Sequence, residues 1–74
     1  MTKHITITLT EDQARDIVGL CSHTNHPNQW YLDTAHLRIG WDKQTTPERI
    51  SQTRRKVAFR KRVIAKLNAE LVKL

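Results

Sequence analysis

Residues 46–74 read TPERISQTRRKVAFRKRVIAKLNAELVKL and predict one long, basic helix. Thr46 can cap its N-terminus, Pro47 suits the first helical position, and nothing further along the stretch should break the helix. Apolar side chains then recur at every seventh residue, at Ile50, Val57, Ile64 and Leu71. Such a helix spans about 40 Å, which is more than the other 45 residues can readily cover. We therefore expect part of it to project, to pack in a homodimer or to lie against a partner.

Positive charge is concentrated in this helix. Residues 54–62 read RRKVAFRKR and contain no acid. Residues 46–74 hold nine lysines and arginines against two acids, a net charge of +7, whereas residues 1–45 hold four against five, a net charge of −1. Cations packed this closely repel one another, so a polyanion such as nucleic acid is the simplest partner.

Helix geometry sorts these cations by face, at about 100° per residue. The candidate binding residues lie on the face opposite the apolar seam or on one border of it: Arg54, Arg55, Phe59, Lys61, Arg62 and Lys66. Lys56 and Arg60 flank the other border, where their stems can cover the seam. An aromatic ring among cations suits the stacking of unpaired bases. In the plainer alternative, Phe59 packs on another helix, and the charged side chains only form a hydrated surface that binds no partner. If about five of these residues met phosphates, affinity would fall about 500-fold between ~50 and ~200 mM salt, an exponent of about −4.5.

The first part of the chain predicts a strand, a helix and a loop. Residues 4–9, HITITL, alternate between apolar and polar and predict a half-buried strand. Thr10 begins the N-cap sequence TEDQ, and spaced apolar residues follow, so we expect a helix from about 11 to about 21. Residues 22–29, SHTNHPNQ, are polar, contain Pro27 and predict a loop.

Residues 30–41 are ambiguous. Partial alternation favours a strand or a hairpin, whereas Trp30, Thr34, Leu37 and Trp41 have helical spacing, with Gly40 as a candidate C-terminal cap. We favour a helix here. The predicted fold is then one small α+β domain over residues 1–74 that is mostly helical. It has one N-terminal strand, a short helix, this ambiguous element and the long basic helix, with residues 1–45 as a near-neutral scaffold.

Size and composition narrow the classes of function. A chain of 74 residues has a thin core and little room for a deep catalytic cleft. Cys21 is the only cysteine, which excludes a disulfide within the chain and fits a cytoplasmic location. No signal peptide and no membrane-spanning run are evident. Because no Gly-rich phosphate loop, paired catalytic carboxylates or activated nucleophile stands out, we expect no enzyme and no cofactor.

Two smaller groups of residues remain candidate sites. Four side chains that can bind zinc lie within sixteen residues: Cys21, His23, His26 and His36. Their spacing matches no familiar zinc module, so a small core cysteine and ordinary histidines are the favoured interpretation. The large aromatic residues Trp30, Tyr31 and Trp41 should anchor the core; the alternative is a binding site for a protein partner.

The stretch ITITLTEDQARDIVGLC, residues 5–21, resembles the start of ribbon–helix–helix DNA-binding proteins. That resemblance implies a dimer in which two strands pair and enter the major groove, with His4, Thr6 and Thr8 toward the bases. The sequence departs from the family in residues 22–34, which are too long and too polar for its short turn and second capped helix. The outward residues of the strand also lack the usual arginine or lysine.

ITITLTEDQA together with the basic tail is also similar to small phage-encoded host-takeover proteins. Among these are regulators that bind bacterial RNA polymerase and alter initiation or termination. The resemblance implies a non-enzymatic transcription regulator that binds nucleic acid, RNA polymerase or both through its basic C-terminal helix. A dimeric ribbon–helix–helix repressor and a module that grips an acidic protein surface are the alternatives.

Overall fold

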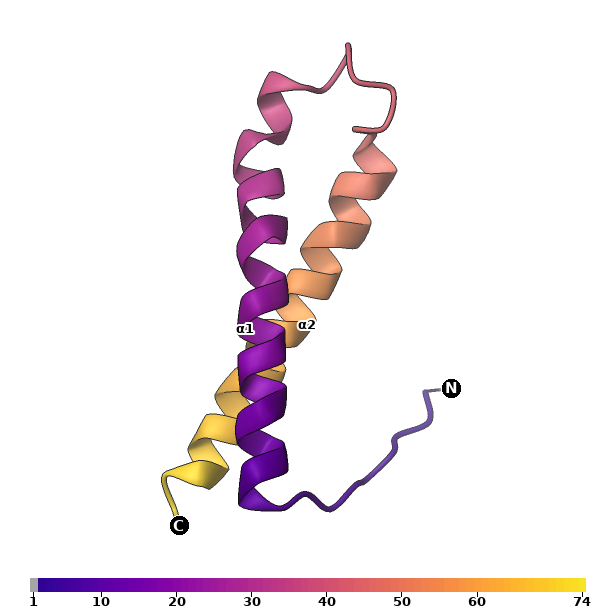
Figure 1. The fold of residues 1–74 in the computed structure, drawn as a ribbon. Helices are drawn as coiled ribbons and strands as arrows, with labels where there is room; N and C mark the ends of the chain where they lie inside the picture. Colours follow the sequence, from indigo (N-terminus) through magenta and orange to yellow (C-terminus); the bar gives the residue numbers. More distant parts are fainter. Residues whose placement is uncertain (1) are drawn as a thin grey trace.

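A computed structural model describes residues 2–74, and its two long helices form an antiparallel hairpin (Figure 1). Helix α1 spans Glu11–Thr34, the short 3₁₀ helix η1 spans Ala35–Leu37, and helix α2 spans Pro47–Leu71. The radius of gyration is 15.5 Å, whereas a compact chain of this length would have about 11 Å. The hairpin is therefore elongated, with most of each helix near solvent.

Helix α1 begins where the sequence predicts. The Thr10 hydroxyl accepts a hydrogen bond from the Gln13 backbone N–H at 3.2 Å, and the Gln13 side chain accepts one from the Thr10 N–H at 2.9 Å. This capping box satisfies two donors that a helix start otherwise leaves free. Glu11 and Asp12 add negative charge beside the positive end of the helix dipole.

Helix α1 then continues through the segment that was predicted to be a loop. The predicted helix end near residue 21 and the predicted loop over residues 22–29 are therefore both wrong. Pro27 lies inside the helix and cannot donate a backbone hydrogen bond. Contacts with α2 hold this part of α1 in place: Asn25 is buried and its side-chain amide donates to the Val57 carbonyl at 3.2 Å. Tertiary packing here outweighs the local polar and proline signals.

The predicted N-terminal strand is also wrong. Residues 2–10 are extended but join no sheet, and Ile5 is 89% exposed. Residues 2–74 contain no strand at all, so the α+β class gives way to an all-helical fold. Alternating apolar and polar residues favour a strand, but a strand forms only where a neighbouring strand pairs with its backbone N–H and C=O groups. A single copy of this chain supplies no such neighbour within residues 2–74.

The ambiguous middle segment is helical only in its first part. Residues 30–34 complete α1, η1 follows, and the chain then turns through residues 38–41. Gly40 lies in this turn with φ of +95°, a conformation that favours glycine. The predicted helix therefore ends earlier than expected, and Gly40 shapes the turn instead of capping a helix.

Helix α2 follows the sequence closely. The Thr46 hydroxyl accepts from the Arg49 backbone N–H at 3.2 Å, and Pro47 is the first helical residue. The seven-residue seam faces α1, with Val57 only 3% exposed and Ile50, Ile64 and Leu71 half-buried. The seam therefore packs within the chain, because α1 has 24 residues instead of about eleven and covers much of α2. The buried apolar core is small: Ala14, Ala35 and Val57.

Candidate nucleic-acid interface

Four residues form an exposed line on the side of α2 that faces away from α1. They are Arg55, Phe59, Arg62 and Lys66, here called the outer ridge, and all four are exposed. Their spacing of four, three and four residues keeps them on one side of the helix over about 16 Å. Phe59 is 59% exposed, so it does not pack on α1, and a flat aromatic surface lies between cations.

The cations of the outer ridge have no carboxylate partner within residues 2–74. The ion pairs of this part of the chain are Arg15 with Glu11 at 2.8 Å and Lys73 with Glu70 at 3.2 Å. Both pairs lie outside residues 54–66. The full charge of the ridge therefore faces solvent, where its potential adds along the helix and attracts polyanions.

The remaining candidate cations lie closer to α1. Lys61 is exposed, but its ammonium donates to the side-chain oxygen of Gln29 at 3.3 Å. Arg54 lies with Lys61 around a shallow pocket that Gln29 and Asp33 also line. Arg60 is half-buried and contacts the Asn25 side chain at 3.5 Å. These three residues border the contact between the helices, whereas the outer ridge lies apart from it.

The turn end of the hairpin carries a second mixed group that the sequence analysis missed. The Arg38 guanidinium lies 5.4 Å from the ring centroid of Trp30 and 5.0 Å from that of Tyr31, and Arg49 lies 5.4 Å from Tyr31. Arg38 also donates to the Tyr31 carbonyl at 3.0 Å. The available signal was the spacing of Arg38, seven residues after Tyr31, which is close to two helical turns.

The aromatic residues predicted to anchor the core separate into two kinds. Tyr31 is half-buried under the two arginines. Trp30 and Trp41 are 63% and 72% exposed, and the Trp41 indole N–H donates to the Leu37 carbonyl. Core anchoring therefore describes only Tyr31. Binding of a protein partner by the two tryptophans stays a prediction.

Asp42 fixes the loop that leads into α2. One carboxylate oxygen accepts the Gln44 backbone N–H and the other accepts the Thr45 hydroxyl, both at 3.0 Å. These hydrogen bonds, the backbone one above all, lower the pKa of Asp42 below the 3.8 of an ordinary aspartate. The ionised carboxylate thus stabilises the folded loop, and Thr45 beside it is buried.

We expect Asp42→Asn to lower the thermal midpoint at neutral pH and to leave it unchanged in strong acid. Because the folded-state pKa lies below the unfolded value, the stabilisation is complete above 3.8 and is lost as pH falls through the folded-state pKa. Circular dichroism melts of wild type and variant at both pH values test this. A difference in midpoint that persists in strong acid would contradict it.

The four candidate zinc ligands do not come together. Cys21 is half-buried, whereas His23, His26 and His36 are exposed. Within residues 2–74, no three histidine, cysteine, aspartate or glutamate side chains form a group that could hold a metal ion. His36 lies in η1, beyond the end of the helix that carries the other three. The four side chains are therefore close in the sequence but do not form a zinc site in the structure.

Comparisons with known proteins add no relative: no family model, curated protein or solved structure matches this sequence. The resemblances to phage regulators and to ribbon–helix–helix proteins accordingly stay predictions. Across residues 2–74, neither helix combines the length and the apolar composition that a bilayer crossing requires.

Proposed function

We propose that this chain binds nucleic acid through the outer ridge of α2. The observation that carries the proposal is the combination of three exposed cations without ion pairs, Arg55, Arg62 and Lys66, with exposed Phe59 between them. The cations can neutralise phosphates, and the ring can stack on an unpaired base. Neither contact requires a cleft, so a narrow two-helix hairpin is sufficient.

A binding module without catalytic groups fits the role of a transcription regulator. The similarity of ITITLTEDQA and the basic tail to phage regulators supports action on DNA, on emerging RNA or beside bacterial RNA polymerase. In this proposal α1 serves as a scaffold that keeps α2 straight and directs the outer ridge to solvent. No step of chemistry is assigned to the chain.

The test is fluorescence anisotropy with a labelled single strand and a labelled duplex of equal length across a salt series. We expect both to bind, with an exponent near −4.5 on the duplex, because Arg54 and Lys61 beside the outer ridge add two phosphate contacts to the three that the ridge cations make. The single strand should bind more tightly than its charge alone explains, because Phe59 can stack only on an unpaired base. Absence of binding at low salt, with capture of a bacterial protein that survives nuclease treatment, would replace nucleic acid with an acidic protein surface.

A further inference from the structure

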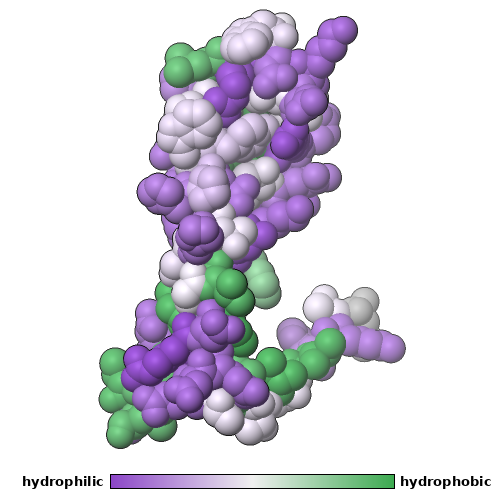
Figure 2. Space-filling view, in the orientation of Figure 1, coloured by the Kyte–Doolittle hydropathy of each residue, from purple (hydrophilic) through white to green (hydrophobic). Residues whose placement is uncertain are grey.

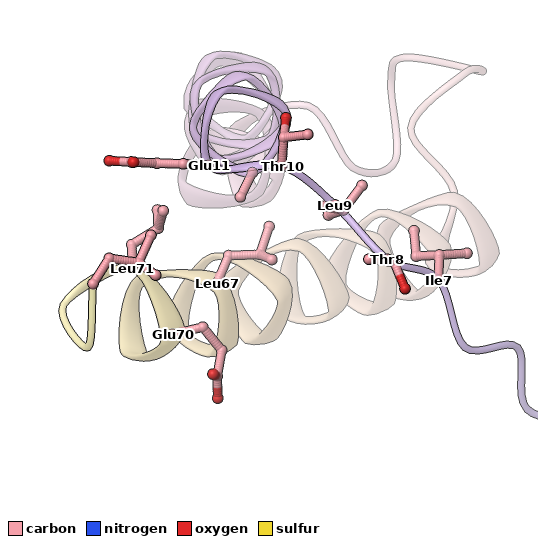
Figure 3. A pocket seen from close by; sticks show the side chains of 10 residues that line it. Ile7, Thr8, Leu9, Thr10, Glu11, Leu67, Glu70 and Leu71 are labelled. Atoms are coloured by element: carbon pink, nitrogen blue, oxygen red, sulfur yellow. The ribbon is translucent and has the colours of Figure 1, made fainter.

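We propose that two copies of this chain associate through the end of the hairpin where α1 begins and α2 finishes, here called the base. An open groove of about 410 Å³ lies there between the N-terminal segment and the two helices (Figure 3). Its apolar lining consists of Ile7, Leu9, Ala14, Leu67, Leu71 and Leu74. Figure 2 shows hydrophobic residues gathered at this end and along the N-terminal segment, and a smaller hydrophobic patch at the opposite end.

Apolar residues around the groove lie in solvent in the single chain. Ile5 is 89% exposed, Ile7 67%, Val72 84% and Leu74 81%. Ile7 and Leu74 line the groove itself. Scattered apolar residues are normal on a surface, but exposed apolar residues that line a groove indicate an interaction site. The buried core that would offset this exposure is small, since no large side chain within residues 2–74 is fully buried.

The chain exposes more surface than a compact monomer of its mass. The chain exposes 6411 Å², whereas a folded monomer of its mass would expose about 4,700 Å². The surplus of about 1,700 Å² is roughly twice the ~800 Å² that each partner buries in a standard interface. A second copy at the base would remove part of this surplus and enlarge a core that is thin in one chain.

The charges at the base favour a second copy over a charged partner. Glu11 and Glu70 are the acids that line the groove, and each is already paired within the chain, with Arg15 and Lys73 respectively. The rim therefore presents little unpaired charge to an acidic or basic partner. A two-fold arrangement brings the same apolar patch from both copies together, so each covers the other. This inference rests on the exposed apolar residues, the total exposed area and the paired charges at the base, and it stands independently of nucleic-acid binding.

Sedimentation equilibrium of the full chain at moderate salt tests the proposal. We expect a mass of twice 8.7 kDa at high concentration that falls toward the monomer on dilution. Ile7→Asp should raise the dissociation constant at least about 100-fold, because it places an unpaired charge in the interface twice. Leu37→Asp is the matched control: Leu37 is 63% exposed but lies at the turn end, so the dimer should persist.

Circular dichroism keeps the result interpretable, since both variants alter exposed residues and should retain wild-type helicity. A wild-type chain that stays monomeric at every concentration overturns the proposal. It is equally overturned if Ile7→Asp leaves the dimer intact, or if Leu37→Asp weakens it as much as Ile7→Asp does. None of these three results affects the anisotropy measurement on monomeric protein, so failure of the dimer proposal is distinct from failure of nucleic-acid binding.

Discussion

Simultaneous replacement of Arg55, Arg62 and Lys66 with glutamine should weaken nucleic-acid binding about 150-fold at ~0.15 M salt. Each phosphate contact releases close to one counterion from the nucleic acid. Loss of one contact therefore lowers the affinity by a factor of about five at this salt concentration. All three side chains are exposed and have no carboxylate partner within the described residues. Their loss should therefore change affinity and leave the helical circular dichroism spectrum as it is.

The salt dependence gives a second measure of the same change. Removal of three phosphate contacts should reduce the duplex exponent by about 2.7, from near −4.5 to near −1.8. The matched control carries glutamine at Lys3, Arg15 and Lys43, which lowers the net charge equally at positions away from the outer ridge. We expect only a few-fold loss for the control. Equal losses in both triple variants would mean that overall charge, and not the outer ridge, attracts the nucleic acid.

Val57→Asp should destabilise the fold by at least about 3 kcal/mol, since it buries a carboxylate without a partner. Val57 is 3% exposed at the centre of the contact between α1 and α2. A chain of this length has a total stability on the order of 4–11 kcal/mol. The variant should thus lose a large fraction of its stability and unfold at a much lower urea concentration than wild type, which urea titration followed by circular dichroism near 222 nm would detect.

Ala58→Asp is the control for this substitution. Ala58 is the next residue of α2 and is exposed, so its carboxylate stays in water and only helix propensity changes, by less than about 1 kcal/mol. Similar urea midpoints for the two variants would show that Val57 does not face α1. The outer ridge lies on the side of α2 opposite Val57, so that result would also remove the evidence that the ridge faces away from α1.

Much of helix α2 could be predicted from its own residues. Thr46 and Pro47 define its start, and apolar side chains at every seventh position define the side that packs, because capping and helical periodicity act within one or two turns. The same periodicity placed Phe59 and its neighbouring cations opposite the seam, where the structure exposes them. The Thr10 capping box followed equally from local sequence.

Only the tertiary structure decided the length of α1, the state of residues 4–9 and the surroundings of the cations. Pro27 and its polar neighbours predict a loop, yet Asn25 is buried against Val57, and contacts between residues 32 positions apart leave no local signal. The alternation of HITITL describes a strand that finds no neighbour in one chain. Lys61 meets Gln29 only because α1 runs past Pro27 and lies alongside α2. The sequence by itself thus determined where the charge and the apolar seam lie along α2, because both depend on spacing within one helix. The packing of the two helices decided which cations are left free for a partner, because that depends on contacts between distant residues.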